Sequence, residues 1–197
     1  MTKLDSEKLK QQMEFSLEID KVKNIFRQTH LADKSRKEND GEHSWHASVM
    51  AIILAEYFPK ADLLKTIKMM LFHDIVEIYA GDTYCYDAKG NEDKEQREID
   101  SANKIYSLLP ISQKEELIDL WQEFEKGESE EAKFCAVLDR LQPLMLNYAA
   151  DGLSWKEHNI KKEQVLERNH IALKESEVIG QYIKDIIEDA HKKGYLN

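Results

Sequence analysis

His73 and Asp74 are adjacent residues inside an apolar stretch, residues 69–79, with the sequence MMLFHDIVEIY. As a helix, this stretch would be apolar nearly all round, which predicts that it is buried. Burying an imidazole and an ionised carboxylate is costly unless something compensates for the lost water. A divalent cation compensates for it, because it binds neutral histidine nitrogen and ionised carboxylate oxygen. A buried His–Asp ion pair is the alternative, and the two residues alone leave both open.

Two more residues have the types and positions that could complete a metal site. His43 precedes an apolar segment, and Asp139 lies in the sequence AVLDRL at 136–141. If the region near 130–150 is helical, the helical neighbours of Asp139 three and four residues away are all uncharged. The pattern predicts that Asp139 points inward and needs a cation. Arg140 is the alternative partner, although adjacent residues on a helix point in different directions.

These candidates follow one another along the chain in the order His43, His73, Asp74 and Asp139. This order resembles that of the HD-domain metal-dependent phosphohydrolases. Glu77 and Asp82, shortly after the His-Asp pair, and Arg27, upstream of it, extend the resemblance. They make the chain similar to the branch that acts as 5′-deoxynucleotidases, of the YfbR and HD-domain-containing protein 2 type. The resemblance runs from about residue 27 to about residue 148.

The resemblance implies an all-α fold, an HD-domain helical bundle of roughly six to eight helices. It also implies a metal-dependent phosphohydrolase, most simply a 5′-nucleotidase that releases phosphate from (deoxy)ribonucleoside 5′-monophosphates. One alternative is a phosphodiesterase or another phosphoester hydrolase of the same superfamily. Another is a non-catalytic helical module that binds nucleotide or metal, and the presence of both Glu77 and Asp82 argues against it.

In this interpretation one divalent cation is bound by two imidazoles and two carboxylates, those of His43, His73, Asp74 and Asp139. Mixed nitrogen and oxygen ligands suit Mn, Co, Fe, Ni or Zn better than Ca. Such a cation would polarise a phosphoryl group and lower the pKa of a bound water.

Glu77 is the first candidate for a catalytic residue. It follows His73 by four residues and Asp74 by three, so on a helix it faces the same region as they do. It could act as a general acid or base on the attacking water or the leaving oxygen. The alternative is that it accepts a hydrogen bond from a ligand imidazole and orients it.

Asp82, Arg27 and Gln28 are the remaining candidate site residues. For Asp82 the resemblance implies a catalytic role near the substrate sugar or a metal-bound water, whereas a turn residue after Gly81 is the alternative. Arg27 is a candidate catalytic and substrate-binding residue, because a guanidinium matches phosphate geometry; a solvated charge at a helix end is the alternative. Gln28 stands where some relatives carry an aromatic residue near the sugar, so selection of deoxyribose over ribose is left open.

Helices are expected over about 6–26, 43–58, 61–80, 92–108, 113–125, 129–150 and 159–191. The first brings Arg27 to its C-terminal end. The second presents Val49, Ile52, Ile53 and Tyr57 as its apolar face. Gly81 ends the third, and a polar loop at 83–90 either covers the site or lies on the surface.

The composition sets the remaining expectations. The 197 residues predict a single domain, 1–197, with a metal-binding helical core at about 27–150 and the last helix packed on it. A formal charge of −10 argues against a nucleic-acid polymer as partner. No apolar run is long enough for a bilayer, and no apolar signal region opens the chain. Two distant cysteines, Cys85 and Cys135, fit a reduced cytoplasmic compartment. The resemblance implies a homodimer.

Overall fold

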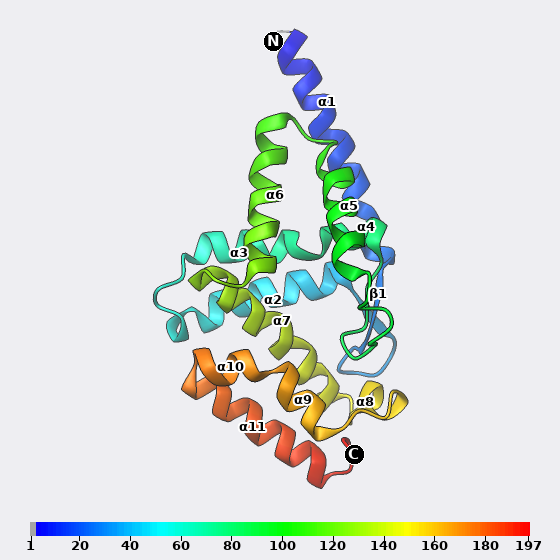
Figure 1. The fold of residues 1–197 in the computed structure, drawn as a ribbon, viewed down its shortest axis with the longest axis vertical. Helices are drawn as coiled ribbons and strands as arrows, with labels where there is room; N and C mark the ends of the chain where they lie inside the picture. The colour runs from blue at the N-terminus through cyan, green and yellow to red at the C-terminus, as the bar shows by residue number, and fades with distance from the viewer. Residues whose placement is uncertain (1–2) are drawn as a thin grey trace.

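The computed structural model describes residues 3–197, and it confirms the all-α class (Figure 1). The expected helices in the middle of the chain are present as α5 (Lys94–Tyr106), α6 (Ile111–Lys126) and α7 (Glu130–Ala149). The other four expected helices are shorter or divided. Two of these differences change the element on which a candidate site residue lies.

The expected helix over 6–26 stops early, and Arg27 lies on a strand instead of at a helix end. Helix α1 (Lys3–Glu18) is followed by the 3-10 helix η1 (Ile19–Asn24) and then by strand β1 (Phe26–His30). Strand β2 (Lys37–Asn39), between the first two expected helices, pairs antiparallel with β1. The aromatic and β-branched side chains of β1 favour an extended backbone. The sequence analysis missed this strand because it is too short to show a clear alternation of apolar and polar residues.

Helix α2 (Asp40–Leu54) begins at a capping box. The Asn39 side chain accepts a hydrogen bond from the Glu42 backbone N–H, and the Glu42 carboxylate accepts one from the Asn39 N–H. This cap places Asp40 and His43 in the first turn of the helix.

The face that α2 buries is not the one that the sequence predicted. Ile52 and Ile53 are 57% and 65% exposed, whereas His43, Ala47 and Ala51 are fully buried. The small alanines let α3 (Leu63–Phe72) and α7 pack closely on this side. The apolar face of α2 was assigned wrongly because the inward-facing side carries the polar site residues.

The expected helix over 61–80 is broken at the His-Asp pair. Helix α3 ends at Phe72, His73–Val76 form the 3-10 helix η3, and Glu77–Ala80 form the short helix α4. A mid-helix stretch of 3-10 conformation often marks a functional position. Gly81 then ends α4 with a positive φ of 78°, as glycine allows.

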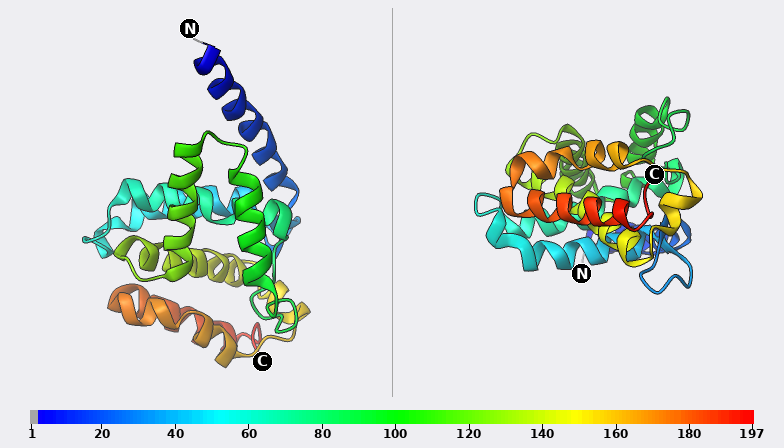
Figure 2. Two further views of the ribbon diagram at one scale, coloured as in Figure 1. Left: turned by 45° about the horizontal axis from the view of Figure 1, so that its top comes forward. Right: turned by 90° about the horizontal axis from the view of Figure 1, so that it is seen from below.

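The C-terminal region contains several helices where one was expected. They are α8 (Leu153–Glu157), α9 (Lys162–Arg168), α10 (His170–Glu175) and α11 (Glu177–Lys192). Elsewhere in the chain, the 3-10 helix η2 (Ala55–Tyr57) follows α2. Helices α9, α10 and α11 form a layer against α7, and α1 projects from the opposite end of the molecule (Figures 1 and 2).

Helix α7 lies at the centre of the fold. It packs against α2, α3, α6 and α10, and its buried side chains belong to one hydrophobic core that extends from Phe15 to Leu196. Cys135, on this helix, is fully buried. None of the helices within residues 3–197 has the length and apolar character needed to cross a bilayer.

Candidate metal centre

Two histidines and an aspartate from three different elements meet at the centre of the molecule. His43 comes from α2, His73 from η3 and Asp139 from α7. Asp139 Oδ1 lies 3.2 Å from His43 Nε2 and 3.8 Å from His73 Nε2. One ligand atom from each of the three lies within 4.8 Å of the others, which is close enough for a single cation to join them.

The two imidazoles are oriented as metal ligands are. His43 Nδ1 donates to Gln142 Oε1 at 2.9 Å, and His73 Nδ1 donates to the Met70 carbonyl at 2.8 Å. Their Nε2 atoms are buried and make no hydrogen bond. When Nδ1 carries the proton, Nε2 has a free lone pair, and this is the usual arrangement of a ligating histidine. The residues therefore fit a divalent cation.

Electrostatics around His73 favour a positive charge at this point. Burial by itself would lower the pKa of His73, but the neighbouring Asp74 and Asp139 carboxylates outweigh it and raise the pKa to about 10. For Asp139 the balance is reversed, since burial opposes ionisation while the two imidazoles hold its pKa well below the usual range. A proton on His73 and a cation at the centre would thus compete for the same nitrogen.

Asp74 lies beside this group and is tied to Arg27. Its Oδ1 is 3.1 Å from His73 Nε2, and its Oδ2 accepts a hydrogen bond from Arg27 Nη1 at 2.9 Å. The second oxygen is 3.9 Å from His43 Nε2. Asp74 can therefore face a cation with one oxygen while the other stays on the guanidinium.

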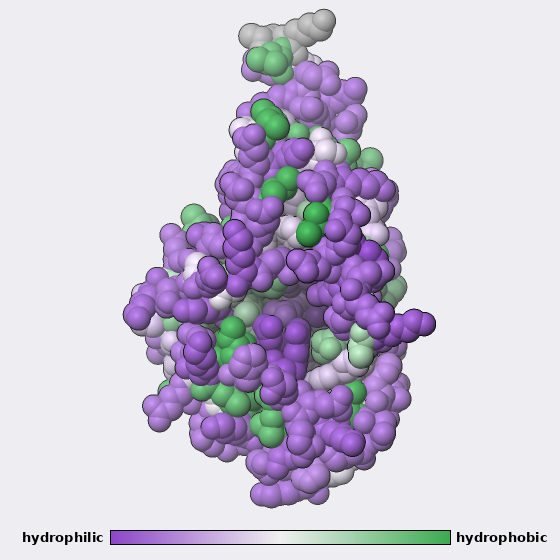
Figure 3. Space-filling view, in the orientation of Figure 1, coloured by the Kyte–Doolittle hydropathy of each residue, from purple (hydrophilic) through white to green (hydrophobic). Residues whose placement is uncertain are grey.

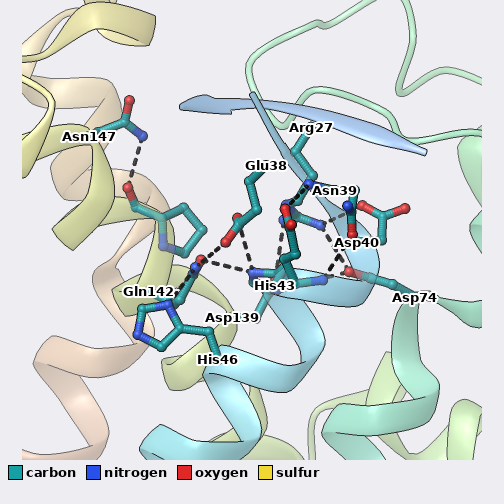
Figure 4. A network of polar contacts seen from close by, with 12 residues as sticks. Arg27, Glu38, Asn39, Asp40, His43, His46, Asp74, Asp139, Gln142 and Asn147 are labelled. Atoms are coloured by element: carbon teal, nitrogen blue, oxygen red, sulfur yellow. Dashed lines mark hydrogen bonds and ion pairs between the residues drawn. The ribbon is translucent and has the colours of Figure 1, made fainter. Parts of the chain in front are cut away.

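Arg27 reaches the site from β1 and is surrounded by carboxylates. Besides Asp74, Nη1 contacts Asp40 Oδ1 at 3.3 Å, and Nη2 lies 3.9 Å from Asp139 Oδ1 (Figure 4). Its Nε is buried and makes no hydrogen bond. Arg27 thus lies inside the site, as the sequence analysis proposed, but it lies on strand β1 and not at the end of a helix.

A second group of carboxylates, Asp40, Glu77 and Asp82, adjoins Arg27, with one oxygen of each within 4.8 Å of the others. Burial, followed by repulsion from Asp74, raises the pKa of Asp40 to about 7. The same two causes raise the pKa of Glu77 well above its ordinary value. Glu77 therefore holds a proton readily. The sequence interpretation missed Asp40, although its position three residues before His43 puts both on one helical face.

A polar network on the far side of His43 was also missed. Gln142 accepts from His43 Nδ1, and its Nε2 donates to Glu38 Oε1 at 2.6 Å and contacts His46 Nδ1 at 3.1 Å (Figure 4). Gln142 is fully buried. It follows Asp139 by three residues, and that spacing was the available signal. The network fixes the tautomer and the ring orientation of His43.

Arg168 is the third missed residue, and it comes from the C-terminal region. Its Nη2 donates to Asp139 Oδ2 at 3.3 Å, whereas Asp139 Oδ1 faces the two histidines. The guanidinium therefore holds the oxygen that points away from the imidazoles. Nothing in the sequence near Arg168 indicates this contact, because it depends on how α9 packs on α7.

A cavity leads from the surface to these residues, and its opening is the purple-lined hollow in Figure 3. His73, Asp74, Glu77 and Asp139 line the cavity at the candidate metal centre, which we call its inner part. We call the rest of the lining its outer part; it comes from β1, α7, α8, α9 and the loop 83–90 and includes Gln28, Tyr84, Tyr86, Asn147 and Trp155. Part of the loop thus forms a wall of the site. Arg97 anchors it by donating to the Ala80 and Gly90 carbonyls and to Thr83 Oγ1.

Comparison with known proteins gives a consistent result. The sequence model of the family described as "HD domain" matches residues 19–179. The mouse and human proteins named 5′-deoxynucleotidase HDDC2 are 33% and 32% identical over 110 residues, which is 56% of this chain and 54% and 53% of theirs. The chain thus spans about half the length of these curated relatives.

Solved structures extend the likeness to the whole chain. The crystal structure of a predicted metal-dependent phosphohydrolase from Magnetospirillum magnetotacticum MS-1 is 42% identical, with a TM-score of 0.91, and covers 100% of this chain and 99% of that one. An HD-domain phosphohydrolase from Listeria innocua has a TM-score of 0.65 at 18% identity, covering 90% of this chain and 88% of that one, which supports the fold alone.

We predict that Asp40→Asn changes how the stability of the metal-free protein depends on pH. The native carboxyl holds a proton up to about pH 7, while an unfolded aspartate releases it near pH 4, so wild-type stability falls as pH rises between these values. The variant lacks this titration and should gain about 2–4 kcal/mol relative to wild type between pH 4 and pH 8. Urea unfolding across this range measures the difference.

The matched control is the exposed Asp119→Asn, whose curve should run parallel to that of the wild-type protein. A wild-type curve parallel to that of Asp40→Asn would contradict the shifted pKa.

We predict that Arg168→Gln weakens metal binding about tenfold, because it frees the Asp139 oxygen that the guanidinium holds. Calorimetric titration of the metal-free protein with Mn²⁺ or Zn²⁺ measures this. Arg140→Gln is the control, since Arg140 is adjacent to Asp139 but donates to the Ala136 carbonyl instead. Equal losses in both variants would mean that only the removed charge matters.

Proposed function

The chain belongs to the HD domain family, and on this premise we propose that it is a metal-dependent phosphohydrolase, most simply a 5′-nucleotidase that releases phosphate from (deoxy)ribonucleoside 5′-monophosphates. One observation carries the proposal. Two buried imidazoles whose Nδ1 atoms are hydrogen-bonded and whose Nε2 atoms are not converge on Asp139, and His73 and Asp139 line the cavity. The names of the HDDC2 relatives support the substrate class.

In this proposal His43, His73, Asp74 and Asp139 hold one divalent cation, of the group Mn, Co, Fe, Ni or Zn. The buried Nε2 atoms of the two histidines, which make no hydrogen bond, and the carboxylates close to them support that role. When bound, the cation would polarise the phosphoryl group and acidify a water.

Glu77 is the proposed general acid. Its raised pKa lets it carry a proton at neutral pH, and it lines the inner cavity beside Asp74. Hydrolysis breaks the bond between phosphorus and the 5′-oxygen, and this oxygen needs a proton as it leaves. A buried carboxyl that keeps its proton can supply one. Asp82 also lines the cavity and is proposed to contact the sugar.

Arg27 is the proposed phosphate ligand. Its guanidinium is fixed by Asp40 and Asp74, which leaves the buried Nε without an acceptor. A phosphate oxygen could accept from that group and would place its charge beside a permanently ionised side chain.

Gln28 is the proposed contact to the sugar. Its Oε1 accepts from Lys37 Nζ at 2.6 Å and lies 3.3 Å from His158 Nε2, and the side chain lines the cavity. An amide does not exclude a 2′-hydroxyl as a bulky ring would. We therefore expect little selection between ribose and deoxyribose at this position.

The proposal predicts metal-dependent release of phosphate from a panel of deoxy- and ribonucleoside 5′-monophosphates, after metal is stripped and Mn, Co, Ni, Zn or Mg is added singly. His73→Ala and Asp139→Ala should lose bound metal and activity together. Glu77→Gln should keep its metal and lose turnover about 100-fold or more, because a general acid contributes roughly that factor.

The control for the histidine variants is His170→Ala, which removes an exposed imidazole that is not a proposed ligand. This variant should keep its bound metal and its activity. Folded wild-type protein that releases no phosphate with any metal would contradict the proposed activity. Metal retained by both ligand variants would contradict the ligand set. Comparable rates for ribose and deoxyribose substrates are expected from Gln28, and a strong deoxy preference would show that another residue selects the sugar.

We also propose a homodimer that forms through the outer face of α2. Trp45, Ile52 and Ile53 are all more than half exposed on this face, and a row of large apolar side chains in water favours association. The double variant Ile52→Lys, Ile53→Lys should sediment as a monomer in analytical ultracentrifugation while wild type sediments as a dimer. A monomeric wild-type protein would contradict the proposal.

We further propose that residues 1–197 form one HD domain, since the hydrophobic core joins Phe15 to Leu196. A cytoplasmic location is proposed on the two free thiols, Cys85 and Cys135, which suit a reducing compartment.

A further inference from the structure

Asn147, in the last turn of α7, has an unusual hydrogen-bonding state. Its Nδ2 donates to the Pro143 carbonyl at 2.9 Å, so the orientation of the amide is fixed by the helix backbone (Figure 4). Its Oδ1 is buried and accepts no hydrogen bond, and the side chain lines the cavity. An unpaired acceptor in a buried position is costly, which favours a ligand that donates to it.

Two contacts connect Asn147 and the cavity lining to α8. The Asn147 carbonyl accepts from the Gly152 N–H, directly before α8. The Tyr84 ring lies 4.5 Å from the His158 ring, directly after α8. Tyr84, Tyr86 and Trp155 also line the cavity, and aromatic rings of this kind offer flat faces to a planar ligand.

The spacing along α7 gives the distance between Asn147 and the metal centre. Asp139, Pro143 and Asn147 all line the cavity and are separated by one helical turn each. Eight residues of helix span about 12 Å. That separation is comparable to the distance from a metal-bound phosphate, through the sugar, to the far edge of the base in an extended nucleoside monophosphate.

We infer that the outer cavity binds the nucleobase and that Asn147 Oδ1 accepts a hydrogen bond from an exocyclic amino group, such as that of adenine or cytosine. The inference rests on the proposed function and adds a base preference to it. An oxo group at the same position would face the amide oxygen with a second acceptor and would leave Oδ1 unpaired. Sites that bury an acceptor for a substrate N–H discriminate strongly against analogues that lack it.

A second amide shows the same pattern on the α9 side of the cavity. Asn169 Nδ2 donates to the Val165 carbonyl at 2.8 Å, and its buried Oδ1 accepts nothing. We assign the amino group to Asn147 because it lies two helical turns from Asp139 on α7, at the distance expected for the base. Asn169 is adjacent to Arg168, which contacts Asp139, so it lies closer to the metal centre.

The test compares two pairs of substrates that differ by an amino-to-oxo exchange: deoxyadenosine with deoxyinosine 5′-monophosphate, and deoxycytidine with deoxyuridine 5′-monophosphate. Wild type should hydrolyse the amino member with a kcat/KM about tenfold or more higher in at least one pair. Asn147→Leu should reduce this ratio to near one by slowing the amino substrate.

Asn103→Leu is the matched control. Asn103 Nδ2 donates to the Ile99 carbonyl at 2.9 Å, the same one-turn contact as in Asn147, but the side chain is exposed on α5. This variant should keep the wild-type ratio, which separates the loss of the acceptor from the loss of a helix contact.

Equal kcat/KM values within both pairs for wild type would overturn the inference while leaving the proposed function intact, and this comparison does not depend on whether Asn147→Leu folds. A ratio unchanged in folded Asn147→Leu would also overturn it, and would leave Oδ1 to water. No hydrolysis of any substrate would overturn the proposed function first.

Discussion

The structure depends on how a set of buried acidic groups is neutralised. Asp40, Asp74, Glu77 and Asp139 all lie in the same interior region, and Arg27 is the guanidinium that reaches three of them. Ionised carboxylates in a protein interior are stable only when they are paired or bind a cation. The raised pKa values of Asp40 and Glu77 indicate that Arg27, together with Arg168 on Asp139, does not neutralise the whole set. A divalent cation near His43 and His73 would supply the missing charge.

This requirement explains the irregular parts of the backbone. The helix that carries His73 breaks into 3-10 conformation at the His-Asp pair, and Arg27 enters on a two-stranded ribbon. The buried side of α2 holds small residues and His43, while its isoleucines face outward. Local preferences are set aside at these places, as expected where side chains must converge on one point. The regular helices α5, α6 and α7, which follow their sequence pattern, form the surroundings that hold them.

The limits of prediction from the sequence follow the same division. Residue types and positions pointed to His43, His73, Asp74, Glu77 and Asp139, because a charged group is conspicuous in or beside an apolar segment. Asp82 and Arg27 were assigned only from the resemblance to the family. Asp40 and Gln142 could have been predicted from the sequence, since each lies three residues from a candidate ligand on the same helix. The strand at Arg27 and the inverted face of α2 were not, because tertiary packing overrides weak local preferences. Arg168 was out of reach because no local pattern encodes contact between α9 and α7.

The contribution of the C-terminal region has a consequence for the site as a whole. Arg168 holds one oxygen of Asp139 from α9, while His43 and His73 face the other oxygen from α2 and η3. A carboxylate held on one side in this way can offer only a single oxygen to a cation, which leaves coordination positions free for water and substrate. Trp155 and Val165, from the same region, line the outer cavity. Helices α8 and α9 therefore act on both parts of the site, on the geometry of a ligand and on the shape of the space beside it. A change in how they pack against α7 would alter metal and substrate binding together.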